Sequence, residues 1–209
     1  MRLARRELLS KCMALGVLTS TANLLPAALA AAWQEKEKPR LAPTPAVELG
    51  PFYKRLAPSN SAMRAPGDPG MPLVVTGQVF SSHGELIPSA IVEVWQTNHE
   101  GLYDLDGYHY RAKLTTPADG KYEFSSVMPG HYPARVCQHI HYAVTAPGCH
   151  PLVTQLYFAT DPVFDGDPDK NYRRDPLVTS RELVRPVTLV GDPKDIHAAV
   201  KFELVLEAL

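Results

Sequence analysis

The sequence predicts an all-β fold, built as a single antiparallel β-sandwich with long decorated loops and an extended N-terminal arm. Its 209 residues include 20 prolines and 13 glycines, which suits short strands joined by stiff turns better than long helices, because interior prolines break helices. Short apolar runs separated by turn residues recur from residue 73 onward. With 45% hydrophobic and 21% charged residues, the chain is large enough to bury one continuous core, so we expect one domain.

Residues 1–32 are predicted to be a cleavable export signal that takes no part in the fold. Basic residues, among them the pair Arg5-Arg6, precede an apolar run from Met13 to Leu18, and Leu-Ala-Ala-Ala at positions 29–32 suits signal-peptidase cleavage. The arginine pair resembles a twin-arginine signal, so we expect an exported, periplasmic protein without stable membrane association after cleavage. An uncleaved anchor or a buried helix fits less well, because polar residues and Pro26 interrupt the apolar run.

The charge balance gives no sign of a nucleic-acid partner. Without residues 1–32 the chain carries 17 lysines and arginines against 21 aspartates and glutamates, a formal net charge of −4. No stripe of basic residues interleaved with aromatic ones is present. Two cysteines remain in this part, Cys137 and Cys149, and the sequence leaves open whether they form a disulfide or two separate buried thiols.

The chain after the signal divides into an arm, residues 33–72, and a core, residues 73–209. Seven prolines between positions 43 and 72 punctuate a stretch without sustained periodicity, which is typical of an extended segment. In the core, turn signals separate runs rich in β-branched and aromatic residues, and helical turns are expected only near Ile196 or within the signal. In order along the chain, the expected strands are residues 73–80, 90–97, 122–127, 135–144, 153–158, 187–190 and 198–206.

Two histidines on one of these strands are candidate metal ligands. Residues at i and i+2 of a strand face the same side of the sheet, so His139 and His141 can reach one cation. Two half-buried polar side chains would give the same pattern, and the pair alone therefore leaves metal binding open.

Two tyrosines are candidate partners for this pair. Tyr103 follows Gly-Leu, and Tyr132 stands in Pro-Gly-His-Tyr-Pro. Phenolates are hard anionic donors that favour a hard, highly charged ion such as iron(III). Most tyrosines are core or rim residues, so residue type alone does not decide. A zinc or copper site made by the two histidines with His131 or His150 would leave both tyrosine motifs unexplained.

The order of these motifs resembles that of the intradiol ring-cleavage dioxygenases, the family of protocatechuate 3,4-dioxygenase-like and catechol 1,2-dioxygenase-like enzymes. The resemblance runs from about residue 50 to residue 158. The similar blocks are Gly50–Tyr53, Val75–Val79, Ile87–Gln96, Asn98 with Gly101–Tyr103, Asp119–Phe124, Met128–Pro133, His139–His141 and Thr154–Phe158.

The resemblance implies a site and an activity. Tyr103 and His141 would be equatorial ligands, and Tyr132 and His139 axial ligands, of one iron(III) per subunit. Gln155 would line the substrate pocket. A catechol-type diol would bind iron through both oxygens and displace Tyr132, which would then accept a substrate proton. Dioxygen would be incorporated between the two hydroxyl-bearing carbons, giving a muconate-type diacid.

Two departures from the family pattern bear on catalysis and substrate. The family usually has a charge-stabilising arginine three residues before the first histidine, where this chain has Val136, and Arg135 is the candidate replacement. Successive strand residues face opposite sides, so the one-residue offset matters unless the chain bulges there. The segment from Tyr132 to His139 is also short, which leaves the particular catechol open. The layout is closer to a protocatechuate-type subunit, and self-association stays open.

The main alternative is a non-catalytic binding module. The blocks around residues 75–95 and 119–133 also resemble prealbumin-like sandwich modules, and a fold alone does not define a function. Such a module has no need of Tyr103, Tyr132, His139 and His141 together, so this set favours the enzyme.

Overall fold

The structure is a computed structural model that describes residues 40–133 and 135–209. The predicted signal, residues 1–32, and the first part of the predicted arm lie outside the described residues. Within the described ranges, no helix has the length and apolar character needed to cross a membrane.

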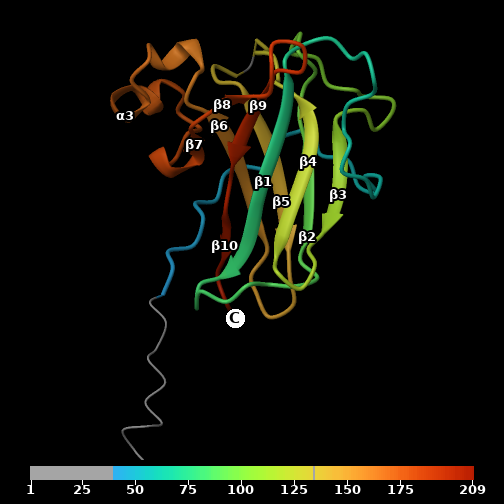
Figure 1. The fold of residues 1–209 in the computed structure, drawn as a ribbon. Helices are drawn as coiled ribbons and strands as arrows, with labels where there is room; N and C mark the ends of the chain where they lie inside the picture. Colours follow the sequence, from blue (N-terminus) through green and yellow to red (C-terminus); the bar gives the residue numbers. More distant parts are fainter. Residues whose placement is uncertain (1–39, 134) are drawn as a thin grey trace, which may run out of the picture. The chain divides into compact units, whose positions relative to one another are not determined.

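The described chain is mainly β-structure arranged in two five-stranded sheets (Figure 1). The first sheet consists of β1 (Pro72–Ser81), β4 (Lys121–Val127), β8 (Thr188–Val190), β9 (His197–Lys201) and β10 (Leu204–Leu206). The second sheet has the order β3 (Arg111–Thr115), β2 (Ile91–Trp95), β5 (His139–Thr145), β6 (Leu152–Phe158) and β7 (Val184–Arg185).

Both sheets are mixed, which corrects the expectation of a purely antiparallel sandwich. β1 pairs antiparallel with β4 on one side and parallel with β9 and β10 on the other, and β7 pairs parallel with β6. The predicted strand 198–206 is divided at Phe202 and Glu203, where Phe202 N donates to Thr76 O at 2.8 Å. The last segments therefore lie beside β1 and run in its direction.

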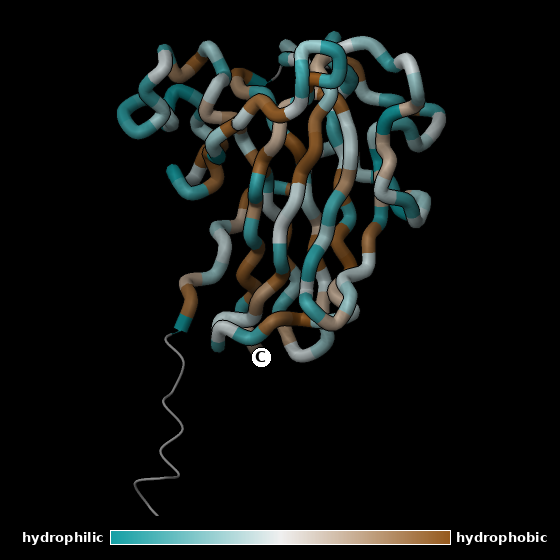
Figure 2. Tube along the Cα trace, in the orientation of Figure 1, coloured by the Kyte–Doolittle hydropathy of each residue, from teal (hydrophilic) through white to brown (hydrophobic). Residues whose placement is uncertain are grey.

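The inner faces of the two sheets share one core. Residues of β1 alternate between buried and half-buried positions along the whole strand, as expected for a strand with one face packed. Tyr142 of β5 packs against Tyr122, Phe124 and Phe202 of the first sheet, with ring centroids 6.3, 6.3 and 5.2 Å apart. Figure 2 shows hydrophobic positions recurring along the strands, with hydrophilic ones gathered in the connecting loops.

Three strands of the second sheet differ from the sequence prediction. β5 begins at His139 and not at residue 135, because residues 135–138 lie outside the strand, and Arg135 N donates to Tyr132 O at 2.9 Å. β3 was not expected, since its sequence Arg-Ala-Lys-Leu-Thr carries charges that weaken the strand pattern. The short β7 was also missed.

Helical turns occur between β6 and β7 and not near Ile196, where the expectation was wrong. They are η1 (Pro162–Phe164), α3 (Pro168–Asn171), η2 (Tyr172–Arg174) and η3 (Arg181–Leu183). Asp161 and Asp167 cap the first two through their side chains, and each is followed by proline, a combination that favours the start of a helix.

The described part of the arm, residues 40–72, is extended and attached to both sheets up to the start of β1. Leu41 N donates to Ser82 O and Val47 N donates to Val153 O, both at 2.9 Å. The two cysteines left open by the sequence are both free, with Cys137 buried two residues before β5 and Cys149 in the turn after it.

Candidate metal centre

The candidate site lies on the outer face of the second sheet, opposite the shared core. Alternation along β5 turns Ile140 and Tyr142 toward the core and His139 and His141 away from it. Cross-strand partners share a face, so the register defines a row of side chains across four strands. In order across the sheet, this row consists of Arg111, Trp95, His141 and Gln155.

A short piece of the arm, residues 48–53, crosses over this row, and we call it the strap. Each member of the row is in contact with the strap. Gln155 Nε2 donates to Glu48 O at 3.1 Å, Arg111 Nη1 donates to Phe52 O at 2.7 Å, and the rings of Tyr53 and Trp95 lie 5.0 Å apart between centroids. Gly50 lies next to the His141 ring, since a Cβ added to it would be 3.2 Å from His141 Cε1. The strap therefore covers the outer face beside His141.

The structure brings the four predicted ligands together from three separate segments. The ring centroids of Tyr103 and Tyr132 lie 5.6 Å apart, those of Tyr132 and His139 5.7 Å, and those of His139 and His141 4.8 Å. Tyr103 lies 6.4 Å from His141 by the same measure. The four rings thus form a closed group, and their assignment as ligands stays a prediction.

Several polar atoms of this group have no hydrogen-bond partner among residues 40–133 and 135–209. They are the Tyr103 hydroxyl and both ring nitrogens of His141, and all three are buried. His141 is held by stacking on Trp95, with ring centroids 4.9 Å apart and an angle of 8° between the planes. His139 Nδ1 lies 2.8 Å from Cys137 O, which fixes the proton on Nδ1 and leaves the Nε2 lone pair facing the site.

Burial controls the protonation of all four side chains. Burial, followed by the positive charge of Arg135, lowers the pKa of His139 to about 4. Burial and the neighbouring His139 lower the pKa of His141 well below its ordinary value. Both imidazoles are therefore neutral near pH 7, with lone pairs available.

The two phenols have the opposite tendency. Burial, with the neighbouring Tyr132, raises the pKa of Tyr103 above its ordinary value, and burial also raises the pKa of Tyr132 against the opposing effect of Arg135. Without a cation both phenols keep their protons, so a cation that binds them must displace those protons.

Arg135 and not Val136 points into the site. Arg135 is buried at 8% exposure and Val136 is exposed at 47%, because this stretch is a loop and not a continuous strand. The guanidinium donates to Tyr157 Oη at 3.0 Å and lies 3.4 Å from Asp175 Oδ2. It also donates to His139 Nε2 at 3.3 Å, a hydrogen bond that a metal on that nitrogen would replace.

Gln155 is buried beside His141, but both ends of its amide are already used. Its Nε2 donates to Glu48 O of the strap, and its Oε1 accepts from Tyr157 Oη at 2.8 Å. Its predicted role in lining a substrate pocket stays a prediction, while the contacts observed connect the strap to β6.

Sequence reasoning missed several residues that build the site. Phe52 stacks on Tyr103, with centroids 4.2 Å apart, and Trp95 stacks on His141. Both stood inside quoted sequence blocks, but no pattern indicated their contacts. No local pattern linked Arg111 to Phe52 or Asp175 to Arg135, since each pair is 40 or more residues apart in sequence.

The other candidate ligands lie elsewhere. His131 Nε2 is 3.1 Å from Asp161 Oδ1, and His150 lies in the turn at the far end of β5. Tyr108 and Tyr110, which are close to Tyr103 in sequence, donate their hydroxyls to Arg55 O and Asp68 Oδ2. Among residues 40–133 and 135–209, no group of three or more His, Cys, Asp and Glu side chains could hold a metal, which counts against the zinc or copper alternative.

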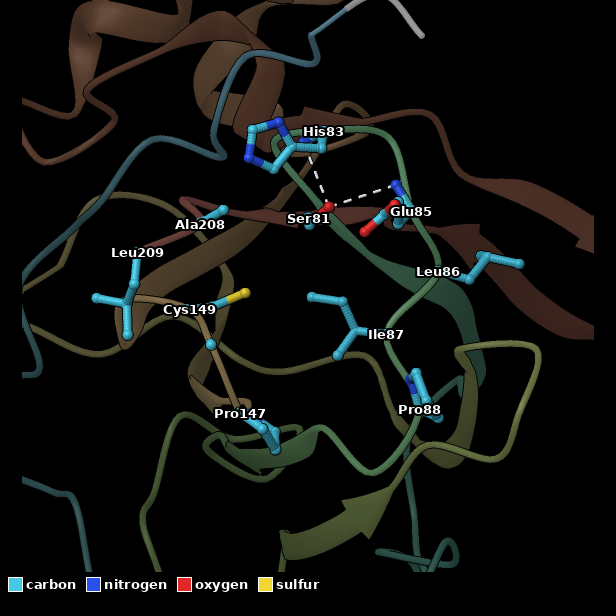
Figure 3. A pocket seen from close by; sticks show the side chains of 11 residues that line it. Ser81, His83, Glu85, Leu86, Ile87, Pro88, Pro147, Cys149, Ala208 and Leu209 are labelled. Carbon is cyan, nitrogen blue, oxygen red and sulfur yellow. Dashed lines mark hydrogen bonds between the residues drawn. The ribbon is translucent and has the colours of Figure 1, made fainter. Parts of the chain in front are cut away.

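A separate pocket of about 410 Å³ lies at that far end of β5 (Figure 3). Its lining includes Ser81, Cys149 and Leu209, and its walls hold neither the tyrosines nor the histidine pair of the candidate centre. Ser81 Oγ accepts from the backbone amides of His83 and Glu85, both at 3.3 Å.

The donor set fits iron(III). A buried polar group without a partner costs about 1–3 kcal/mol, so the unpaired atoms of Tyr103 and His141 call for a ligand. Two phenols that become phenolates and two neutral imidazoles supply hard and borderline donors, which suit a trivalent iron ion better than a soft metal.

Fold and site together define a protein of two mixed β-sheets that carries a group of two tyrosines and two histidines, the candidate metal ligands, on the outer face of one sheet. The chain matches the family described as dioxygenase over residues 49–208. It is 34% identical over 148 residues to catechol 1,2-dioxygenase 2 of Acinetobacter lwoffii, covering 57% of this chain and 52% of that protein. It is 30% identical over 188 residues to chlorocatechol 1,2-dioxygenase of Rhodococcus opacus, covering 76% and 70%.

A solved structure of a dioxygenase domain is also similar to this chain. The dioxygenase domain of a dioxygenase and carbohydrate-binding protein fusion from Streptomyces sp. SirexAA-E superposes with a TM-score of 0.70 at 31% identity, over 80% of this chain and all of that one. The chain belongs to the intradiol ring-cleavage dioxygenase family, which confirms the resemblance seen in the sequence motifs. It spans about half of the length of the Acinetobacter relative.

Proposed function

We propose that this protein cleaves the ring of a catechol-type aromatic diol between its two hydroxyl-bearing carbons, with dioxygen as co-substrate and one iron(III) per chain. The product would be a muconate-type diacid. The observation that carries the proposal is the convergence of Tyr103, Tyr132, His139 and His141, with the Tyr103 hydroxyl and the His141 ring buried and unpaired.

The proposed ligands are these four side chains. When bound, iron(III) supplies a hard Lewis-acidic centre that takes both oxygens of a catechol. The chain fixes the donors before the metal arrives: Trp95 stacks on His141, Phe52 stacks on Tyr103, and Cys137 O sets the tautomer of His139. This preorganisation reduces the cost of ordering the site when metal and substrate bind.

Tyr132 and Arg135 are the proposed participants in proton and charge handling. The Tyr103 hydroxyl is buried without a partner among the described residues, whereas Tyr132 is half-buried beside Arg135, which opposes the rise of its pKa. The Tyr132 oxygen is therefore the phenol oxygen that we assign to taking a proton from an incoming diol. Arg135, fixed by Tyr157 and Asp175, places a positive charge beside the group where negative charge on the substrate would develop.

Relatives named for catechol, chlorocatechol and hydroxyquinol support a catechol-type substrate, without selecting one. The non-catalytic module is not favoured, because the chain matches the dioxygenase family across the site and keeps the complete tyrosine and histidine set.

The decisive experiment is the visible spectrum of the purified protein before and after anaerobic catechol, followed by oxygen consumption once air is admitted. A phenolate to iron(III) charge-transfer band that shifts with catechol is expected, together with one dioxygen consumed per ring cleaved. A protein that stays colourless after iron(III) reconstitution would refute the proposal, and the non-catalytic binding module would then be the better interpretation.

We also propose that the protein acts outside the cytoplasm, on the basis of the Arg5-Arg6 signal. Cell fractionation of the natural host tests this, with the amino terminus of the periplasmic form determined by mass spectrometry. A mature form beginning near residue 33 is expected. Full-length protein confined to the cytoplasm would contradict the proposal.

A further inference from the structure

Arg111 is a buried cation for which the proposed chemistry gives no role. Its side chain, at the start of β3, is only 2% exposed. Nη1 donates to Phe52 O at 2.7 Å, Nη2 donates to Asp104 O at 3.3 Å, and Nε has no partner among the described residues. In the part of the chain that the structure describes, no ion pair involves Arg111, although salt bridges are present elsewhere.

A charge in such a place needs a structural reason. Removing a guanidinium from water is costly unless its donors are satisfied, and burial lowers the pKa of Arg111 despite nearby acidic groups. Arg111 satisfies two donor groups with main-chain carbonyls. Those carbonyls come from segments 52 residues apart in sequence, at Phe52 and Asp104, so the side chain joins parts of the protein that no strand pairing connects.

The two segments joined by Arg111 meet at Tyr103. Asp104 directly follows Tyr103, so a bond to Asp104 O restrains the backbone that carries the tyrosine. Phe52 belongs to the strap, and its ring stacks on the Tyr103 ring at 4.2 Å with an angle of 19°. The guanidinium carbon itself lies 6.0 Å from the centroid of the Tyr103 ring.

We propose that Arg111 is a positioning residue that joins the strap to the Tyr103 loop, residues 96–110 between β2 and β3, and so fixes the Tyr103 ring for metal binding. The link to metal binding rests on the proposed function, whereas the joining of the two segments does not. Arginine suits the task better than lysine, because its planar fork directs two donors to two fixed acceptors.

Substitution by methionine and by lysine separates this role from general packing. Arg111→Met keeps much of the aliphatic stem and removes both bonds, whereas Arg111→Lys keeps the charge but can serve only one acceptor well. Lys54→Met is the matched control, since Lys54 donates to the carbonyls of Leu105, Asp106 and Gly107 in the same loop but not to Phe52 or Asp104.

The first measurement is hydrogen–deuterium exchange in metal-free, full-length protein. Arg111→Met is expected to accelerate exchange about tenfold or more in both residues 47–53 and residues 101–104, with β1 and β4 unchanged as a check on global folding. Lys54→Met is expected to accelerate exchange only around residues 105–108. Wild-type exchange in both segments of Arg111→Met would overturn the proposal. If that variant does not fold, wild-type exchange in Arg111→Lys would overturn it instead.

The second measurement is the visible band of the iron(III)-loaded proteins, with steady-state kinetics. Arg111→Met is expected to shift the phenolate to iron band and to lower kcat about tenfold with little change in KM, because a small misplacement of a ligand is costly. Lys54→Met should keep the wild-type band. A wild-type protein that gains no band would refute the proposed function, while the exchange data would still decide the role of Arg111.

Discussion

Arg135 connects the candidate ligands with a buried carboxylate. Its guanidinium contacts His139 Nε2, Tyr157 Oη and Asp175 Oδ2, and Asp175 Oδ2 also accepts from Cys137 N at 3.2 Å. Both partners of the ion pair are almost fully buried, with side chains 6% and 2% exposed. Removing Arg135 therefore has two effects. It takes away a positive charge beside the proposed substrate position, and it lowers the stability of the fold.

We predict that Arg135→Ala lowers kcat by about 10²-fold without loss of iron, because a positioned positive charge is missing when the substrate becomes anionic. The same change should cost roughly 3–5 kcal/mol of stability, since Asp175 keeps a buried, unpaired charge. Metal analysis measures the iron content, steady-state kinetics give kcat, and thermal unfolding gives the stability. The double variant Arg135→Ala, Asp175→Asn should regain stability but not turnover, and recovered turnover would show that Arg135 has no part in charge stabilisation.

From the sequence, only those residues of the candidate site could be predicted that stand in recognisable local motifs. His139 and His141 share a face because a strand alternates, and that rule placed them correctly. The same rule left Arg135 unresolved, because it assumed a strand where the chain forms a loop. The contact of Asp175 with Arg135 could not be predicted, since the two residues are 40 positions apart in sequence.

At the scale of elements, the strap depends on a glycine. Gly50 has φ of +72°, a left-handed conformation that costs little only for glycine, and a Cβ built there would lie 3.2 Å from His141 Cε1. Gly148 has nearly the same φ, +71°, but a Cβ there would meet nothing within 4 Å. A side chain at either glycine would strain the backbone, but only one at Gly50 would also contact the site. Comparing the two substitutions therefore distinguishes the two effects.

We predict that Gly50→Ala and Gly148→Ala each lose about 1 kcal/mol of unfolding free energy through backbone strain. Only Gly50→Ala should also disturb His141, and its iron affinity should fall several-fold for that reason. Chemical denaturation gives the stability and titration with a competing chelator gives the affinity. Equal iron affinity in the two variants would mean that the strap yields without moving His141.

Another contact of the arm responds to pH. The Asp68 carboxylate accepts from Ala65 N at 2.8 Å and Tyr110 Oη at 3.1 Å, and lies 2.8 Å from His109 Nε2. Burial pushes the pKa of Asp68 upward, but these three partners together hold it below its ordinary value. The folded state thus binds the proton more weakly than the unfolded chain.

A lowered carboxyl pKa stabilises the fold above the unfolded pKa, near 3.9, and this stabilisation is lost as the pH falls through the folded value. We predict that Asp68→Asn costs about 1 kcal/mol at pH 6 and progressively less below pH 4. Urea unfolding at both pH values tests this. Asp165→Asn, which breaks only an exposed pair with Arg174, is the control and should change little. If the loss of unfolding free energy were the same at both pH values, the effect would come from altered packing at Asp68 and not from its charge.

The elements themselves were predictable where apolar residues alternate, and less so where tertiary contacts decide. β1 matched its predicted range to within a residue at each end, because one face is packed along its whole length. β3 was missed because the residues that hold it include a buried arginine paired with strap and loop carbonyls. The helical turns after β6 do have a local signal, Asp-Pro at 161–162 and 167–168, although no helix was predicted there.

At the scale of the whole molecule, the candidate centre connects segments that the sheets leave independent. The strap, the Tyr103 loop, the Tyr132 loop and β5 meet through ring contacts and not through strand pairing. Loops that carry functional side chains on a rigid sandwich are a common arrangement. A metal bound by both loops and β5 would therefore act as a cross-link over long stretches of chain.

We predict that iron(III) raises the thermal unfolding midpoint of the metal-free protein. A ligand present at about 100 times its Kd stabilises the folded state by about 2.7 kcal/mol. For a chain of this size that corresponds to an increase of roughly 5–10 °C. Calorimetry with and without iron(III) measures it, and zinc(II) should give a smaller increase, because the phenolate oxygens favour the harder ion.

Matched tyrosine variants show where the metal acts. Tyr103→Phe keeps the stacking ring but lacks the oxygen, so its iron-dependent increase should be much reduced. Tyr108→Phe loses only a hydrogen bond to Arg55 O and should keep the full increase. If Tyr103→Phe is stabilised as much as the wild type, Tyr103 is no ligand. If zinc(II) stabilises the wild type as much as iron(III) does, the two phenols do not select the metal, and a site based on the histidines alone becomes the better explanation.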